Sequence, residues 1–389
     1  MSKWAIGRGV LCPPVLRVAI IFAIVVAVFA PFNFVAFRAL TRIHPRRRRI
    51  VIALVVLGNL MWLLFPILNA RTPFSRLARA VLGPPWFAWQ CFAIIYTAVV
   101  LLLALGWLFV RKRARFTQFA RWPSRAFLWI TIIGGVIGVY QALVPLRVER
   151  VPVVLRDLPP SLEGKRIALL ADLHVGLFTR RSRLQRIFAT TNALRPDIVL
   201  LAGDHVDDDP AFVPKLIDGM RPLDTSIPLF GVLGNHEMYG APAELIARLR
   251  ATRVRLLVNE GADVGGLWVA GISDYAAQTP ELRPNMAAAL RARPPAAFPI
   301  VVSHQPKSFD EARRRGVALT LCAHTHGGQC GFRPLHWSLA GLFLPYHMGL
   351  YERGGAQLYV NTGTGYWLLP WRLGMTPEIT LIELRRAPR

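Results

Sequence analysis

Four long apolar stretches without a charged residue constrain this chain more than any other feature of its sequence. We predict membrane-spanning helices at about residues 18–37, 50–70, 86–110 and 126–146. Each stretch reaches the roughly 20 residues that a helix needs to cross about 30 Å of hydrocarbon. Buried helices of soluble proteins rarely stay uncharged for so long, and a cleaved signal peptide would explain only the first stretch. The sequence therefore predicts a transmembrane region of four helices over residues 1–147.

The charges between these stretches predict how the helices are oriented. Residues 38–49 and residues 111–125 each carry six Lys or Arg, whereas the N-terminal tail and residues 71–79 carry three each. Under the positive-inside rule, the two more basic loops face the cytoplasm. We therefore expect an integral membrane protein with its N-terminus and its C-terminal half outside the cytoplasm.

The net charge of +25 does not by itself indicate a nucleic-acid-binding protein. Residues 1–150 hold 20 basic residues and one acidic residue, so most of the excess lies in the apolar half. A nucleic-acid-binding protein carries its basic surface on a folded soluble face. Residues 151–389 hold 27 basic and 21 acidic residues. We therefore expect the membrane lipid bilayer, and not a nucleic acid, as a partner.

After a Pro-containing linker near residues 151–160, short apolar runs alternate with helix-like segments. The expected strands are residues 167–171, 198–202, 228–233, 267–271, 300–302, 319–322, 357–360 and 378–384. The expected helices are residues 182–194, 243–250, 280–293 and 307–315. This alternation is typical of a layered α/β domain. We predict one such domain over residues 148–389.

Side chains suited to metal binding follow five of the expected strands, at the point where each strand ends. In chain order they are Asp172, His174, Asp204, Asn235, His236, His304, His324 and His326. In open α/β sheets, ligand sites collect just beyond the carboxyl ends of the strands. Mixed imidazole and carboxylate ligands suit Mn, Fe or Zn better than Mg or Ca. Any one of these histidines alone would be read as structural, but the whole set predicts a centre for two metal ions.

In this order the motifs resemble those of the calcineurin-like metallophosphoesterases, over about residues 148–385. The tail, with Gly363-Thr364-Gly365, Arg372-Leu373-Gly374 and Pro377-Glu378-Ile379, is similar to a membrane-associated bacterial phosphodiesterase branch. That branch includes UDP-2,3-diacylglucosamine pyrophosphatase-like enzymes. The resemblance implies a β-sandwich flanked by helices, and hydrolysis of a phosphoester by metal-activated hydroxide. Ala323 departs from the family's Gly before the His-x-His motif, but this change removes no ligand.

The resemblance also implies a role for each member of the motif set. Of the two divalent or mixed-valence metal ions, one would be bound by Asp172, His174, Asp204 and His326. The other ion would be bound by Asp204, Asn235, His304 and His324. His236 would be the catalytic residue, which stabilises charge on the phosphoryl group and protonates the leaving oxygen. Glu237 would support the loop on which His236 lies.

Two apolar clusters near the expected site, within residues 331–351 and 366–371, bear on the substrate. These residues either pack in the core under a long loop or form an exposed apolar surface beside the membrane that admits lipid tails. The second reading favours a phosphodiester or pyrophosphate bond in a lipid or cell-envelope substrate, with a diester preferred to a monoester. The alternative function is a non-catalytic membrane protein whose domain binds metal without turnover. Cys322 and Cys330 either pair in an oxidising compartment or remain thiols.

Overall fold

The computed structural model of the protein describes residues 14–68, 73–110, 115–239 and 241–388. Contacts divide the chain into two compact units, Met1–Ile132 and Ile133–Arg389. The division falls inside helix α4 (Phe116–Leu143) and not in the segment that follows this helix. The domain boundary expected after residue 147 stays a prediction.

The first unit is built from long helices: α1 (Pro14–Ile43), α2 (Arg48–Leu68), α3 (Pro73–Val110) and most of α4 (Phe116–Leu143). Three segments of the described chain are long and apolar enough to cross a membrane, namely Val26–Ile43, Val81–Val110 and Phe116–Leu143. Within the described residues, three candidate spans stand where the sequence predicts four. The span expected at 50–70 falls on α2 and stays a prediction, because part of it lies outside the residues whose side chains the structure describes.

Helix α3 also begins earlier than the sequence predicts. We expect its start near residue 86, because Pro84 and Pro85 normally end a helix. In the structure both prolines lie inside α3, which runs without a break from Pro73 to Val110. Membrane helices tolerate such prolines, because neighbouring groups satisfy the carbonyls that lose their partners.

Polar side chains link the helices of the first unit. Asn33 of α1 donates to Gln90 of α3 over 2.7 Å, and Asn59 of α2 donates to Asn33 over 3.0 Å. Interhelical amide hydrogen bonds of this kind stabilise helix packing in membranes.

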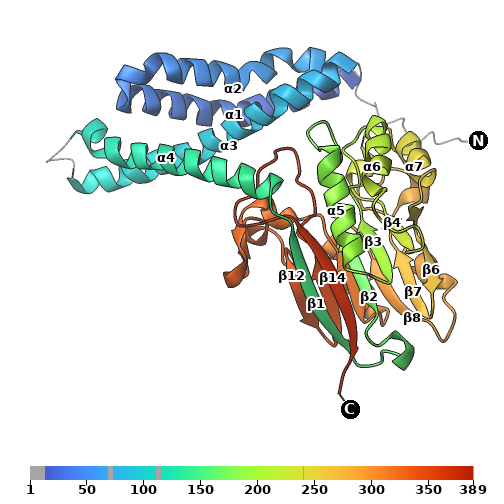
Figure 1. The fold of residues 1–389 in the computed structure, drawn as a ribbon. Coiled ribbons are helices and arrows are strands. Elements are labelled where there is room, and N and C mark those ends of the chain that lie inside the picture. The colour runs from blue at the N-terminus through green and yellow to red at the C-terminus, as the bar shows by residue number, and fades with distance from the viewer. Residues whose placement is uncertain (1–13, 69–72, 111–114, 240, 389) are drawn as a thin grey trace, which may run out of the picture. The chain divides into compact units, whose positions relative to one another are not determined.

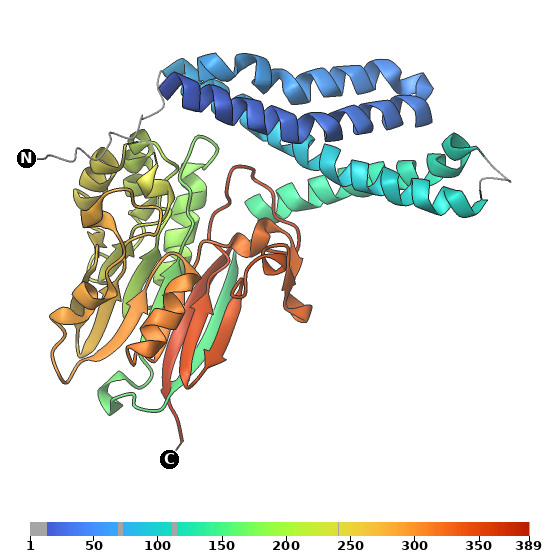
Figure 2. The same cartoon turned by 180° about the vertical axis from the view of Figure 1, so that it is seen from behind.

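The second unit is a sandwich of two six-stranded sheets (Figure 1). The first sheet has the order β1 (Arg147–Leu155), β14 (Glu378–Arg386), β2 (Arg166–Leu170), β3 (Ile198–Ala202), β4 (Leu229–Val232) and β5 (Arg255–Leu256). The second, which can also be followed from behind (Figure 2), has the order β12 (Gly349–Arg353), β13 (Ala356–Val360), β9 (Leu319–Cys322), β8 (Phe298–Val302), β7 (Leu267–Gly271) and β6 (Glu260–Val264). Two further short strands, β10 (Gly331–Phe332) and β11 (Trp337–Ser338), pair antiparallel as a hairpin.

The main hydrophobic core lies between the sheets, with inward-facing residues such as Leu169, Leu200, Ile300 and Leu321 from both. Helices α5 (Arg181–Ala193), α6 (Val213–Met220) and α7 (Pro242–Arg250) bury their apolar faces on the first sheet. Helices α8 (Met286–Arg291) and α9 (Phe309–Arg314) pack on the second. The structure therefore has the layered α/β arrangement that the sequence predicts.

The first half of the expected linker at residues 151–160 is the end of strand β1. β1 pairs in parallel with β14 at the edge of the first sheet, and Pro152 lies within it. A proline is tolerated there because an edge strand leaves one row of backbone N–H groups unpaired. The helix expected at 280–293 is shortened to α8, since residues 280–282 form a separate 3₁₀ turn.

Candidate metal centre

The parallel strands bring the predicted site residues to one end of the sandwich. β2, β3 and β4 run parallel in the first sheet, and β7, β8 and β9 run parallel in the second. The side chains that follow β2, β3, β4, β8 and β9 all come from the carboxyl ends of these strands. Six of them gather into two groups of potential metal ligands, Asp172 with His174 and His326, and Asp204 with His304 and His324. His236 lies in a third, overlapping group with His174 and Asp207.

The first group is almost completely buried. The Nε2 atoms of His174 and His326 lie 3.1 Å apart, and Nε2 of His326 lies 3.8 Å from Oδ1 of Asp172. Both oxygens of Asp172 are buried, and neither has a hydrogen-bond partner among the described residues. A buried carboxylate without such partners is costly unless a cation compensates it. This donor set therefore fits a bound metal ion.

The second group has the same close spacing. Nε2 of His304 lies 3.2 Å from Oδ2 of Asp204 and 3.1 Å from both Oδ1 of Asn235 and Nδ1 of His324. Nδ1 of His304 donates to the carbonyl oxygen of Ala202 over 2.7 Å. That bond fixes the ring so that Nε2 faces the other potential ligands, as outer partners of metal-binding histidines do.

Asp204 lies between the two groups. Its Oδ2 atom is 3.5 Å from Nε2 of His174 in the first group and 3.2 Å from Nε2 of His304 in the second. Its Oδ1 atom accepts a hydrogen bond of 2.9 Å from the backbone N–H of His236. One carboxylate oxygen is thus within reach of both candidate positions for an ion.

The backbone at the centre is strained. Five non-glycine residues of the ligand set have a positive φ: Asp172, His174, Asp204, His324 and His326. Such conformations cluster at functional sites and cost about 1–3 kcal/mol each. Two glycines allow the close packing, because a Cβ at Gly203 would lie 2.6 Å from Nδ1 of His304, and one at Gly234 would lie 2.2 Å from Oδ1 of Asp204.

The close charges shift the pKa values of the ligand set. Burial, opposed by His304 and reinforced by Asp204, raises the pKa of Asp172 to about 6. Burial disfavours the charged form of His304, but Asp204 and Asp172 outweigh it and raise its pKa to about 10. Burial and the charge of His304 lower the pKa of His324 to about 3. Without a cation, the positive charge of protonated His304 therefore partly neutralises the negative charges of the carboxylates at neutral pH.

His236 lies at the border of the centre and is half buried. Its ring meets that of His174 edge to face, with the centroids 4.6 Å apart, and its Nδ1 atom has no hydrogen-bond partner in the described chain. Burial, and then His174, lower the pKa of His236, against the opposing effect of Asp204. The ring is thus held next to both ligand groups with one nitrogen unengaged.

Glu237 holds together the loops that carry Asp204 and His236. Its fully buried carboxylate accepts hydrogen bonds from the backbone N–H groups of Asp204 (3.0 Å), His205 (2.9 Å) and Gly234 (2.7 Å). These bonds satisfy three donors that no strand pairs. They are the loop support that the sequence leads us to expect of Glu237.

Two further side chains contact the ligand set without being predicted. Oδ1 of Asp207 lies 3.2 Å from Nδ1 of His174 and orients that ring. The fully buried guanidinium of Arg372 donates from Nη1 to the carbonyls of Thr362 (2.7 Å) and Met375 (3.2 Å), and its Nη2 lies 2.9 Å from Nδ1 of His326. In the sequence, Arg372 is marked only by the Arg-Leu-Gly triplet of the tail, which supports the family resemblance but does not indicate a contact with His326.

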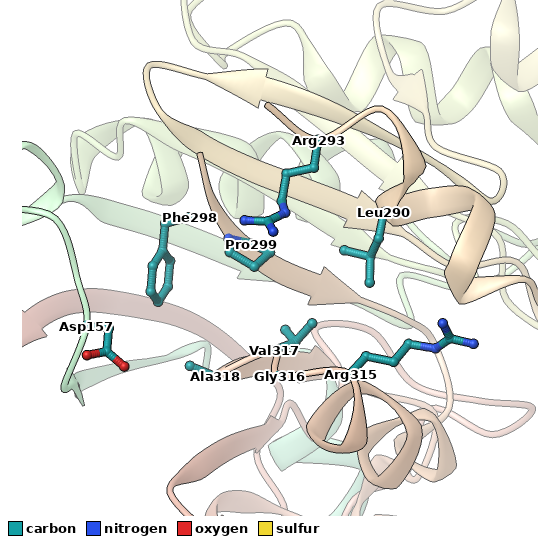
Figure 3. Close-up of a pocket in the computed structure, with 9 residues that line it drawn as sticks. All are labelled: Asp157, Leu290, Arg293, Phe298, Pro299, Arg315, Gly316, Val317 and Ala318. Atoms are coloured by element: carbon teal, nitrogen blue, oxygen red, sulfur yellow. The ribbon is translucent and has the colours of Figure 1, made fainter. Parts of the chain in front are cut away.

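A pocket elsewhere in the second unit does not belong to this centre. Its lining includes Phe298 and Pro299 at the start of β8, and Val317 and Ala318 just before β9 (Figure 3). The metal-ligand residues follow the opposite ends of the same strands. Cys322 is buried and Cys330 is half-buried, and both are free thiols in this structure.

Comparison with known proteins finds the family that the motifs resemble, and one relative also matches residues outside the family's conserved domain. Residues 165–328 match the calcineurin-like phosphoesterase family. A Danio rerio protein named transmembrane protein with metallophosphoesterase domain is 32% identical over 333 residues, which cover 78% of this chain and 75% of that protein. A Helicobacter pylori strain J99 protein named uncharacterized metallophosphoesterase is 31% identical, over 64% of this chain and 66% of its own length.

A relative with a named activity covers less of the chain. Phosphodiesterase YaeI of Escherichia coli K12 is 30% identical over 56% of this chain and 82% of its own length. Among solved structures, a dimetal phosphatase from Danio rerio is matched over 52% of this chain and 88% of its own, at 13% identity and a TM-score of 0.36.

Proposed function

The chain belongs to the calcineurin-like metallophosphoesterase family, and from that membership we propose that it is a membrane-anchored phosphodiesterase with a centre of two metal ions. Membership supports the general reaction, metal-dependent hydrolysis of a phosphoester. The observation that carries the proposal of two ions is the position of Asp204, whose Oδ2 atom faces His174 at 3.5 Å and His304 at 3.2 Å.

The described side chains supply a complete set of donors for both ions. The first would be held by Asp172, His174, Asp204 and His326, and the second by Asp204, Asn235, His304 and His324. Imidazole and carboxylate donors in this mixture favour Mn, Fe or Zn. When bound, such ions stabilise negative charge on phosphoryl oxygens and acidify a water molecule.

His236 is proposed as the catalytic residue. It is not needed as a ligand, its ring lies edge to face with His174, and its Nδ1 atom is unengaged in the described chain. A histidine in this position can donate a hydrogen bond to the phosphoryl group and a proton to the leaving oxygen.

The proposed substrate is a phosphodiester or pyrophosphate bond of a lipid or cell-envelope molecule. Two features support it, the apolar helices of the first unit and the exposed aromatic side chains that follow the ligand motifs. Trp367 is 41% exposed, and its backbone N–H donates to the side chain of Gln329, three residues after His326. The loop charges support a catalytic domain outside the cytoplasm of a bacterial plasma membrane.

Turnover by the full-length protein in detergent, with Mn²⁺ and a chromogenic aryl phosphodiester, tests this function. Asp204→Ala and His236→Ala should each reduce kcat by at least about 100-fold, in line with loss of a general acid or of the centre itself. Asp208→Ala is the matched control, because Asp208 is exposed and only four residues from Asp204.

The same assay tests the non-catalytic alternative, in which the domain binds metal without turnover. Binding of Mn²⁺ with no hydrolysis of monoesters, diesters or extracted membrane lipids would favour that alternative. Hydrolysis of the monoester alone would contradict the proposed diester preference.

The lipid part of the proposal has its own test. Replacing Trp367 with Gln should lower kcat/KM for a phospholipid in mixed micelles at least about fivefold and leave the small aryl diester unaffected. An equal loss on both substrates would contradict a lipid substrate while leaving the phosphodiesterase activity in place.

A further inference from the structure

Residues 332–344 form an exposed apolar segment next to the candidate metal centre. The segment follows the turn that carries His324 and His326. Leu335 is 75% exposed and Phe343 is 80% exposed. The other large exposed side chains of the segment are Phe332, Trp337, Leu339, Leu342 and Leu344. Contiguous apolar surface of this kind marks a site of interaction with a protein or a membrane.

The apolar segment 332–344 presents no free charge. Its one charged side chain, Arg333, points inward, where its guanidinium contacts the buried carboxylate of Glu378 and the hydroxyl of Thr362. Its histidine, His336, is hydrogen-bonded to the hydroxyl of Tyr351 over 3.1 Å. A lipid surface is therefore a better match than a charged protein partner, since no side chain here offers an ion pair.

The base of the segment is fixed to residues 371–374. The backbone N–H of Gly331 donates to the carbonyl of Leu373 over 2.9 Å, and the N–H of Leu373 donates to the carbonyl of Gln329 over 2.8 Å. These bonds place the beginning of the segment beside Leu373.

Residues 371–374 are in turn fixed to the last turns of α4, which belong to the same compact unit. Nε1 of Trp371 donates to the carbonyl of Gly134 over 3.2 Å, and the backbone N–H of Arg372 donates to the carbonyl of Gly138 over 2.9 Å. The side chain of Gln141 accepts from the N–H of Gly374 over 2.7 Å. Both views place the segment beside this end of α4 (Figures 1 and 2).

These contacts define a depth. Gly134 lies nine residues before Leu143, the end of α4, and a helix rises 1.5 Å per residue, so Trp371 contacts α4 about 14 Å from its end. Helix α4 is a candidate membrane span to that end, and Val136 and Tyr140 on it are 67% and 59% exposed. Gly138 and Gln141 lie five and two residues before Leu143, so Arg372 and Gly374 contact α4 about 8 and 3 Å from its end. A loop attached between these levels of a membrane-spanning helix begins in the outer part of the hydrocarbon layer, which is about 30 Å thick.

We propose that the apolar segment 332–344 inserts into the acyl-chain layer beside the last turns of α4. The catalytic domain is then partly embedded in the bilayer, and its metal-binding turn lies near the lipid headgroups. The inference rests on α4 spanning the membrane and not on catalysis. It extends the proposed function by giving a route for an acyl chain to the site.

Photolabelling of the full-length protein tests the insertion. The metal-free protein in phosphatidylcholine vesicles is irradiated with phosphatidylcholine that carries a diazirine in its acyl chain, and labelled peptides are identified by mass spectrometry. We expect label on residues 332–344 at a level similar to residues 133–143. Because neither metal nor substrate is present, loss of the proposed enzyme activity would not affect this result.

Val154 provides the control within the same chain. It is 43% exposed on β1, seven residues and therefore about 23 Å along the strand from Arg147, just after α4. The double variant Leu342→Glu, Phe343→Glu should reduce labelling of the segment at least about fivefold, and Val154→Glu should not. The proposal is overturned if residues 332–344 are labelled no more than the Val154 peptide, or only by a diazirine placed at the headgroup.

Discussion

At the scale of single residues, the metal centre depends on side chains that hold the ligands as well as on the ligands. Arg372 is the clearest case, because it is completely buried and contacts three separate segments near His326. We expect Arg372→Gln to weaken Mn²⁺ binding about 10- to 100-fold, the usual effect of removing a group that positions a metal ligand, because the carbonyls near His326 lose their shared donor. Titration calorimetry measures this, with the exposed Arg385→Gln as the control. An unchanged Kd would show that Arg372 serves only the packing.

Proton release is expected when the centre takes up metal. The pKa of about 10 at His304 means that the metal-free site holds a proton at pH 7, which must leave before the imidazole can bind an ion. The pKa of about 6 at Asp172 adds a second competing proton as the pH falls below 7. The Kd for Mn²⁺ should therefore rise from pH 7 to pH 5. At pH 7 the apparent binding enthalpy should vary with the ionisation enthalpy of the buffer, and a buffer-independent enthalpy would contradict this.

Glu237 is expected to affect stability as well as activity. Its carboxylate accepts from three backbone N–H groups in a fully buried position. Glu237→Gln removes the charge and one acceptor oxygen, which should cost about 2 kcal/mol. A lower thermal unfolding midpoint of the metal-free protein would show it, and Glu244→Gln on the exposed face of α7 should leave that midpoint unchanged.

The sequence predicts the members of the ligand set but not what holds Arg372. The ligands follow strand ends, and their residue types in order are specific enough to be found without a structure. The partners of Arg372 are mainly backbone carbonyls, of His326, Thr362 and Met375. A carbonyl has no side-chain signature, so only the fold reveals this interaction.

At the scale of elements, the end of α4 is joined to the catalytic domain by a close contact at one glycine. A Cβ at Gly138 would lie 2.1 Å from Nε1 of Trp371, whereas a Cβ at Gly135 would meet nothing within 4 Å. Gly138→Leu should therefore displace Trp371 and lower the free energy of unfolding of the catalytic domain by about 1–3 kcal/mol. Gly135→Leu is the matched control. Equal unfolding midpoints for the two variants would contradict a structural role for this contact.

The elements that sequence reasoning found differ in burial and length from those that it missed. The strands at 166–170, 198–202 and 319–322 are almost wholly buried and read as apolar runs. β1 alternates exposed and buried residues at a sheet edge and contains Pro152, so it looks like a linker. Helix α6 has only eight residues and follows an acidic loop, so it is too short for a clear period.

At the scale of the whole molecule, the expected orientation can be measured directly. Loop charges predict that the C-terminal half lies outside the cytoplasm. Alkaline phosphatase fused after residue 389 should therefore be active, because it folds only outside the cytoplasm, and green fluorescent protein at the same point should not fluoresce. Fusions after residue 112 should give the opposite pair of results. Fluorescence from the fusion after residue 389 would reverse the orientation.

The order of strands in the first sheet has a consequence for synthesis. β14, the last strand along the chain, lies between β1 and β2 and pairs with both. β1 leaves the ribosome directly after α4, but β14, its one partner among the described strands, is made more than 200 residues later. The sheet can close only after residue 386 has been translated, so the unpaired strand must be kept from aggregation until then.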